Sequence, residues 1–187
     1  MNERICGSCM LCCELLPVVP LNKKGGERCK HQRSVVSMEG AGCAIYRKKG
    51  FPGECGLWNC RWLVDETTRK LLRPDISHYV IDIVPDFVRA QDRGREVQVP
   101  VIQVWCDPRY PDAHRDPALR EWVSRNEPEC LVLVRYGEAE AITLIPPHLS
   151  DTGNWEEISD GPRMQIENRT HSGEEIAAVL TNTGAMK

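Results

Sequence analysis

Residues 78–105 combine apolar runs with a turn signal in a way that predicts two β-strands. The segments 78–90 and 97–105 are rich in β-branched residues, which fit the pleated surface of a sheet. Pro85 and Pro100 favour an edge position or a bulge, because proline cannot donate a hydrogen bond to a neighbouring strand. The run Asp92-Arg93-Gly94 between the two segments is typical of a turn.

A helix and a second pair of strands are predicted after residue 115. Asp116 and Pro117 are typical of an N-cap and a first helical position, and apolar residues at 119, 122 and 123 continue with helical spacing. The apolar segments 130–136 and 139–145 flank Gly137 and Glu138, which predict a two-residue hairpin turn. The order of elements predicts an α+β fold, in which a small antiparallel sheet packs against one or two helices.

The chain divides into three regions by composition. Residues 1–73 are rich in cysteine, glycine and basic side chains, residues 74–149 hold the predicted ββαββ elements, and residues 150–187 form a polar tail. Ser172 and Glu175 have the spacing of a capping box, so the tail is expected to hold a short helix. The first region has few apolar runs from which to build a core. We therefore expect an irregular module that a bound metal stabilises.

Cysteine is the unusual part of an otherwise ordinary composition. The 187 residues are 41% hydrophobic and 27% charged, which is common in globular proteins, but they include 10 cysteines. No apolar run approaches the roughly 20 residues of a membrane helix, and the first residues lack the apolar stretch of a signal peptide. We therefore expect a cytoplasmic protein with no membrane partner. Thiols stay reduced in the cytoplasm, which favours metal binding over disulfides.

Eight of the ten cysteines gather near the start of the sequence. Four lie in the run CGSCMLCC at 6–13, where the C-x-x-C spacing lets two sulfurs reach one metal ion. In a helix, positions 6, 9 and 13 would share a stripe with position 12 beside it. Adjacent side chains point apart, so positions 12 and 13 need not serve the same ion, and eight sulfurs divide naturally into two sets of four. The predicted metal ligands are Cys6, Cys9, Cys12, Cys13, Cys29, Cys43, Cys55 and Cys60.

The spacing of these cysteines is similar to that of a known family. The run CGSCMLCC is followed by CKH at 29–31, GCAIY at 42–46 and PGECGLWNC at 52–60, with Trp62 just behind. This pattern resembles the CxxCxxCC family of zinc- or iron-chelating proteins, also called YkgJ-type cysteine-cluster proteins. The resemblance implies metal chelation by the same eight cysteines and leaves the biochemical role undefined. The family often shows Arg-Pro after its C-x-x-Y element, where this chain has Phe51-Pro52.

Zinc is the expected metal, with iron or a [4Fe-4S] cluster as the alternative. Thiolate-rich sites select zinc or iron–sulfur clusters, and C-x2-C-x2-C resembles three corners of a four-iron cluster. The next cysteine of a ferredoxin follows after three residues, whereas Cys13 follows Cys12 directly. A closed four-sulfur zinc site has no free position for substrate, whereas a cluster can carry electrons in a redox protein or enzyme component. His31 is a further candidate ligand, although a solvent-facing loop histidine is the simpler interpretation.

The uneven charge of the chain raises nucleic acid as an alternative partner. Residues 1–73 hold 13 Lys and Arg against 7 Asp and Glu, and residues 74–187 hold 11 against 20. A basic half is also found in nucleic-acid-binding zinc modules. Metal-bound thiolates would add negative charge to the same half, so the basic residues are expected to offset the metal sites. Metal ions are therefore the predicted partners, nucleic acid is not expected, and no particular protein partner is indicated.

The rest of the sequence predicts no catalytic residues. It contains no Gly-rich phosphate loop, HExxH or GxSxG motif, so it does not predict an enzyme. Cys106 and Cys130 are expected to be buried, with a reactive thiol as the alternative. Trp58 and Trp62 are expected to shield the cysteine cluster from water. Segment 105–116 contains Cys106, Asp107, Asp112, His114 and Asp116. We expect it to be a proline-rich connection, with a second metal or catalytic loop as the less favoured interpretation.

Overall fold

The computed structural model describes residues 4–33, 42–84, 86–92, 94–137 and 141–159. The strands are β1 (Gln32–Arg33), β2 (Gly42–Cys43), β3 (Tyr79–Ile81), β4 (Asp86–Asp92), β5 (Arg95–Cys106), β6 (Leu131–Arg135), β7 (Ala141–Ile145) and β8 (Glu156–Ser159). The α-helices are α1 (Leu11–Leu15), α2 (Gly53–Leu57), α3 (Arg61–Val64), α4 (Pro74–Ser77) and α5 (Pro117–Asn126). Short 3₁₀ turns are η1 (Val19–Leu21), η2 (Glu66–Lys70) and η3 (Ala113–Arg115). No helix in these ranges is long and apolar enough to cross a membrane.

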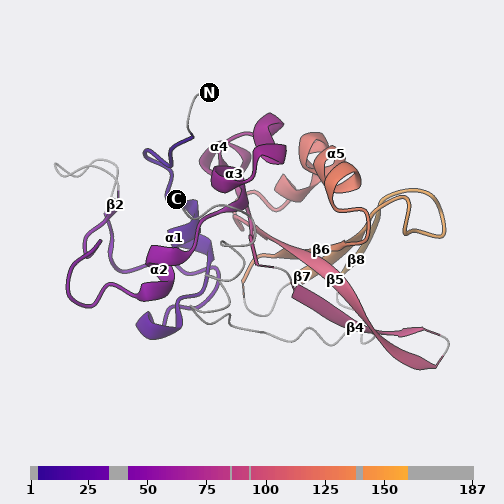
Figure 1. Cartoon of the computed structure of the whole chain (residues 1–187), viewed down its shortest axis with the longest axis horizontal. Coiled ribbons are helices and arrows are strands. Elements are labelled where there is room, and N and C mark those ends of the chain that lie inside the picture. The colour runs from indigo at the N-terminus through magenta and orange to yellow at the C-terminus, as the bar shows by residue number, and fades with distance from the viewer. Residues whose placement is uncertain (1–3, 34–41, 85, 93, 138–140, 160–187) are drawn as a thin grey trace.

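One six-stranded sheet forms the centre of the protein (Figure 1). Its order is β3-β5-β6-β7-β8, and β4 pairs with the first half of β5. The helices and this sheet confirm the α+β class. Neighbouring strands are antiparallel except β5 and β6, which run parallel. The sheet is therefore mixed, because α5 carries the chain back as a crossover between β5 and β6, whereas a short turn would have joined them antiparallel.

The predicted strand 78–90 is two strands, and the irregularity expected in it is present. Ile81 lies opposite Val104 and Asp86 lies opposite Val101, so five steps along this segment face three steps along β5. Between the two strands, the carboxylate of Asp82 accepts the backbone N–H of Val84 at 3.1 Å. The excess residues interrupt the pairing and separate β3 from β4.

The remaining predicted elements of residues 116–145 are present, and two expectations fall partly or wholly outside the described residues. Pro117 opens α5, and the side chain of Asp116 accepts the N–H of Ala118 at 2.9 Å, as the sequence predicted. Strands β6 and β7 form the expected antiparallel pair, with Arg135 opposite Ala141. The connection 136–140, which contains the predicted turn, is described only in part. The helix expected at Ser172 and Glu175, in the tail, lies beyond the described residues.

One face of the sheet packs against α5 and forms the larger core. Val104 of β5 and Val134 of β6 are fully buried on this face. They contact Leu119, Trp122 and Val123 of α5, the apolar positions that the helical spacing predicted. This core fixes α5 above the sheet in Figure 1.

The cysteine-rich region packs on the opposite face through α1, whereas Leu71 at its end belongs to the core around α5. Side chains alternate along a strand, so Trp105 of β5 points away from the face that holds Val104. Trp105 and Val80 are buried against Leu11 and Leu15 of α1. In Figure 1, α1 and α2 accordingly lie to the left of the sheet, away from α5.

Two glycines let the loop after η1 approach the sheet closely. A Cβ atom on Gly25 would lie 2.7 Å from the ring of Trp105, and one on Gly26 would lie 2.7 Å from the carbonyl oxygen of Tyr136. The N–H of Gly26 donates to the carbonyl oxygen of Leu15 at 2.7 Å. The loop therefore links α1 to the segment that follows β6.

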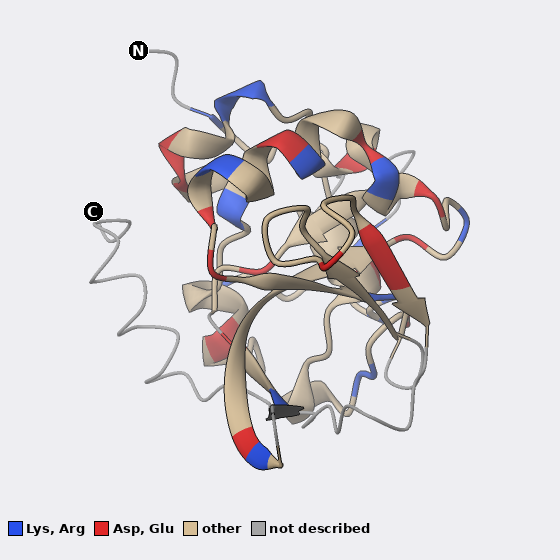
Figure 2. Cartoon of the chain, turned by 90° about the vertical axis from the view of Figure 1, so that its right-hand side faces the viewer, with Lys and Arg blue, Asp and Glu red and all other residues tan. Residues whose placement is uncertain are grey.

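Ion pairs join the basic and acidic parts of the chain. Arg61 pairs with Glu127, and Lys70 lies 3.8 Å from Glu121. Figure 2 shows Lys and Arg interspersed with Asp and Glu over the helices that face the viewer. The uneven charge of the sequence is thus partly balanced within the fold.

Replacing Gly26 with alanine is expected to destabilise the protein more than the same change at Gly50. Both glycines have positive φ, +78° and +86°, but only Gly26 has a backbone atom in the way of a Cβ. We expect urea unfolding to give a loss of about 2–3 kcal/mol for Gly26→Ala and about 1 kcal/mol for Gly50→Ala. Equal losses would show that the loop is not held against Tyr136.

Candidate metal centre

The first four predicted ligands lie in the turn before α1 and on α1 itself. Cys6 is exposed and Cys9 is half-buried, and the N–H of Cys9 donates to the carbonyl oxygen of Cys6 at 2.9 Å. Cys12 and Cys13 are half-buried on α1. The first C-x-x-C step is thus a tight turn, and the run ends in a helix.

Backbone hydrogen bonds bring the next two predicted ligands to α1. The N–H of Cys29 donates to the carbonyl oxygen of Cys13 at 2.9 Å, and the carbonyl oxygen of Cys29 accepts the N–H of Gln32 at 3.0 Å. Gln32 pairs with Cys43 across β1 and β2. His31, the further candidate ligand, is half-buried, and its carbonyl oxygen accepts the N–H of Ala44 at 2.8 Å. Cys29 and Cys43 are therefore tied to α1 through the main chain.

The last two predicted ligands come from the segment of α2 and α3. Cys55 is exposed on α2, and Cys60 directly precedes α3 as its N-cap. Cys60 is only 8% exposed and packs in the apolar cluster of α1 and Trp105. Cys9 and Cys12 pack against the same cluster. Cys60 is thus the predicted ligand held most firmly on the sheet.

All ten cysteines are free thiols, and their surroundings set different acidities. Burial raises the pKa of Cys60 to about 12, and burial together with neighbouring sulfurs raises the pKa of Cys55 to about 11. A hydrogen bond from Cys12 instead lowers the pKa of Cys13 to about 7. Cys13 is therefore the readiest of these three to ionise at neutral pH.

The predicted ligands fit a thiophilic metal in donor type, but their side chains are not gathered. Within the described ranges, no three or more His, Cys, Asp or Glu side chains are already arranged to hold a metal ion. The donors are free thiols, which zinc and iron–sulfur sites prefer. Metal binding at these residues therefore requires the thiols to turn toward one another.

Lys23 is a buried cation beside the cysteines. The sequence did not predict its role there. The residue is 7% exposed, and its Nζ donates to the carbonyl oxygens of Leu16 and Lys24. Burial lowers the pKa of Lys23, and the nearby sulfurs of Cys29 and Cys13 oppose this change. A positive charge here favours thiolate over thiol. Nothing in the run NKKGG distinguishes the buried lysine from its exposed neighbour.

Trp58 and Trp62 lie beside one predicted ligand, and their shielding role stays a prediction. Both are half-buried and pack against the apolar cluster that contains Cys60. The indole N–H of Trp58 donates to Asp82 at 3.0 Å, and that of Trp62 donates to the carbonyl oxygen of Leu71 at 3.0 Å. These hydrogen bonds fix both rings at the rim of the cluster.

Two acidic residues of loop 105–116 make contacts within the fold. Asp107 is 3% exposed and accepts from the guanidinium of Arg109 at 2.6 Å. Asp116 caps α5 and accepts from the hydroxyl of Tyr79 at 2.8 Å. Cys106 is buried as expected, whereas Cys130, in the loop before β6, is half-buried.

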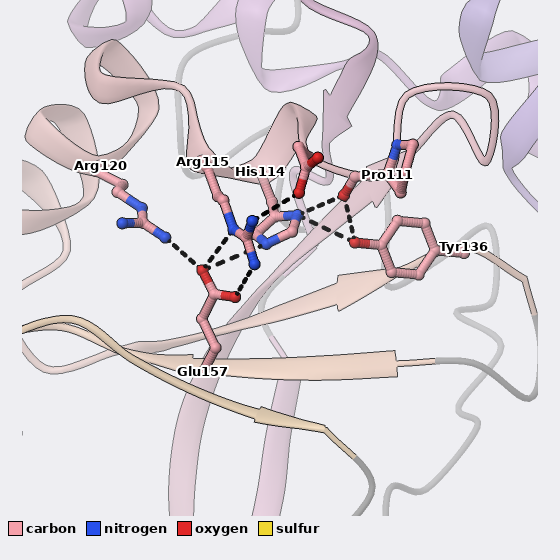
Figure 3. A network of polar contacts seen from close by, with 7 residues as sticks. Pro111, His114, Arg115, Arg120, Tyr136 and Glu157 are labelled. Carbon is pink, nitrogen blue, oxygen red and sulfur yellow. Dashed lines mark hydrogen bonds and ion pairs between the residues drawn. The ribbon is translucent and has the colours of Figure 1, made fainter.

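A polar network around the buried His114 ties the same loop to β8 (Figure 3). His114 is 2% exposed, and its Nδ1 lies 2.8 Å from the carbonyl oxygen of Pro111 and 3.0 Å from the hydroxyl of Tyr136. A carbonyl oxygen only accepts, so Nδ1 carries a proton. The Nε2 atom lies 3.5 Å from the carboxylate of Glu157. His114 therefore bridges the loop and the last described strand.

No family model matches this sequence, and no curated protein or solved structure is significantly similar to it. The resemblance to the CxxCxxCC family therefore stays a prediction that rests on cysteine spacing. A function can therefore be proposed only from the sequence pattern and from the geometry of the described residues.

Replacing Glu157 with glutamine is expected to lower stability at pH 7 and to matter less in acid. The hydrogen bond from Arg115 is the first cause that lowers the pKa of Glu157 to about 2. A carboxyl with a lowered folded-state pKa stabilises the fold above about pH 4.3, and this contribution is lost as the pH falls toward 2. The side chain is 26% exposed, so solvent screening limits the expected loss to about 1 kcal/mol at pH 7.

Urea unfolding of wild-type protein and Glu157→Gln at pH 7 and pH 3 measures this contribution. The difference between the two proteins is expected to shrink by about half at pH 3. A difference that stays the same at both pH values would contradict the role assigned to the carboxylate.

Proposed function

We propose that this chain is a metal-binding protein whose eight N-terminal cysteines chelate zinc, with an iron–sulfur redox role as the second candidate. One observation carries the proposal: the segments that contain the eight free thiols adjoin α1 on one face of the sheet. Thiolate is the ligand that zinc and iron–sulfur sites share. When bound, a closed four-sulfur zinc site supplies structure and offers no open position for a substrate.

The small core of the cysteine-rich region supports a metal as its missing source of stability. Structural zinc contributes on the order of 10 kcal/mol to the folding of small modules. A region of this length with few buried apolar side chains needs such a contribution. In the described part of residues 4–73, the buried apolar side chains are Met10, Leu11, Leu15, Leu16, Cys60 and Leu71.

The proposed compartment is the cytoplasm, and the proposed partners are metal ions. Cysteines that are all free match a reducing compartment, where thiols remain available to metals. Nucleic acid is not part of the proposal, because basic residues such as Arg61 and Lys70 already pair with Glu127 and Glu121 within the fold.

Protein purified without oxygen is expected to carry about two zinc ions per chain. Replacing both Cys9 and Cys60 with serine is expected to remove at least about half of this metal, because two donors are lost. Cys130→Ser is the matched control outside the eight cysteines and is expected to retain all of it. Elemental analysis measures the metal, and acid-labile sulfide with iron would identify a cluster instead. Less than about a tenth of an equivalent of any metal in the wild-type protein would contradict the proposal.

Zinc binding at pH 7 is expected to release about three to four protons per ion. Thiols such as Cys55 and Cys60, with pKa values of about 11 and about 12, are protonated at that pH and must lose their protons to bind. The sign is fixed: affinity for zinc falls as the pH is lowered, because protons compete for the sulfurs. Titration of the metal-free, reduced chain in weak buffer with a pH indicator counts the protons. Release of fewer than about one proton per zinc ion would indicate ligands other than thiols.

A further inference from the structure

Cys12 and Cys13 point to different sides of α1. Leu11 and Leu15 of this helix are buried against the sheet. Successive helical residues are about 100° apart around the helix axis. Cys12 therefore lies at the edge of the buried face, and Cys13 lies on the side of the helix opposite the buried face. In agreement, Cys12 packs against the apolar cluster and Cys13 does not.

Three other cysteines lie on the Cys12 side. Cys60 is buried in the apolar cluster, and Cys9 packs against it beside Cys12. Cys6 is joined to Cys9 by the hydrogen bond of their tight turn. Cys6 and Cys9 are also electrostatic neighbours of Cys60. Cys9, Cys12 and Cys60 thus share one apolar cluster, and the tight turn attaches the exposed Cys6 to Cys9.

The remaining cysteines lie on the Cys13 side. Cys29 is bound to Cys13 through its backbone N–H, and Cys43 follows through the β1–β2 pair. Cys55 on α2 has Cys13, Cys29 and Cys43 as its electrostatic neighbours. Lys23, the buried cation, lies next to Cys13 and Cys29 as well.

We infer that the eight cysteines form two separate four-sulfur metal sites, one on each side of α1. The inner site consists of Cys6, Cys9, Cys12 and Cys60, and the outer site consists of Cys13, Cys29, Cys43 and Cys55. This inference rests on the proposed function, because it assigns ligands to the metals proposed there. The inner site joins the start of the chain to the α3 segment on the sheet, and the outer site joins α1 to the β1–β2 hairpin and α2.

The two sites are close neighbours. The thiols of Cys12 and Cys13 share a hydrogen bond, and Cys6 is an electrostatic neighbour of Cys13. The alternative is a single cluster that uses all eight sulfurs. An experiment therefore has to distinguish this cluster from two separate sites. Separate sites lose one metal when one set is damaged, whereas a joint cluster loses both.

Counting zinc by native mass spectrometry on the full chain tests the assignment. The inner double variant C9S/C60S and the outer double variant C43S/C55S are each expected to keep about one of two zinc ions. The mixed variant C55S/C60S, with one change in each set, is expected to keep none firmly bound. Cys130→Ser is the control and is expected to keep both. An inner or outer double variant that loses both ions, or a mixed variant that keeps one, would overturn the pairing.

Wild-type protein loaded with cadmium-113 tests the same pairing without substitutions that could unfold the chain. Cadmium prefers thiolate ligands as zinc does, and NMR correlates each cadmium ion through its bonds with the Cβ protons of its own cysteines. Two signals are expected, one correlated with the inner four residues and one with the outer four. A signal that correlates with cysteines of both sets would overturn the assignment.

Metal binding and the pairing of the cysteines can be tested apart. Wild-type protein that binds neither zinc nor cadmium would overturn both the proposed function and the pairing. Wild-type protein that binds about two ions, with a different pattern of losses and correlations, would overturn the pairing and leave metal binding intact.

Discussion

The packing of α1 against Trp105 and Val80 determines the positions of the cysteines on this helix and in the segments attached to it. Leu11 and Leu15, four positions apart, are buried on this face of the sheet and fix the rotation of the helix. That rotation leaves Cys12 at the sheet and turns Cys13 toward the loops. The hydrogen bonds from Gly26 to Leu15 and from Cys29 to Cys13 then attach the following segment to the same helix. Without the packing of α1 on the sheet, few contacts would fix the positions of the loops in the first part of the chain.

The rest of the cysteine-rich region is held by half-buried apolar side chains of α2 and α3, by Leu71, and by polar contacts and close backbone approach. Its helices within the described residues are short, and β1 and β2 pair over two residues each. Such a region gains little from apolar burial, so a bound metal would couple its folding to the metal supply. The buried Lys23 fits this account, because an ammonium among thiols costs less once those thiols are ionised.

The sequence predicted elements that depend on local patterns and missed features that depend on distant partners. Asp116 and Pro117 mark the start of α5 because capping and the fixed φ of proline are local effects. The parallel pairing of β5 with β6 was not predicted, because it depends on the α5 crossover placing β6 directly beside β5. The break between β3 and β4 was expected as an irregularity, but its extent follows from how both strands pair with β5.

The candidate site shows the same division. The identity of the eight thiols and the divergence of Cys12 from Cys13 follow from spacing alone. The proposed division into two sets could not be predicted, because it depends on the side of α1 that meets Trp105. The burial of Lys23 had no signal in the sequence, since the adjacent Lys24 is exposed.

X-ray absorption at the metal edge, on protein purified anaerobically, tests the central claim most directly. The account predicts a first shell of about four sulfur atoms at about 2.3 Å from each zinc ion. A first shell dominated by nitrogen or oxygen at about 2.0–2.1 Å, or an absorption edge too weak for a stoichiometric metal, would contradict it.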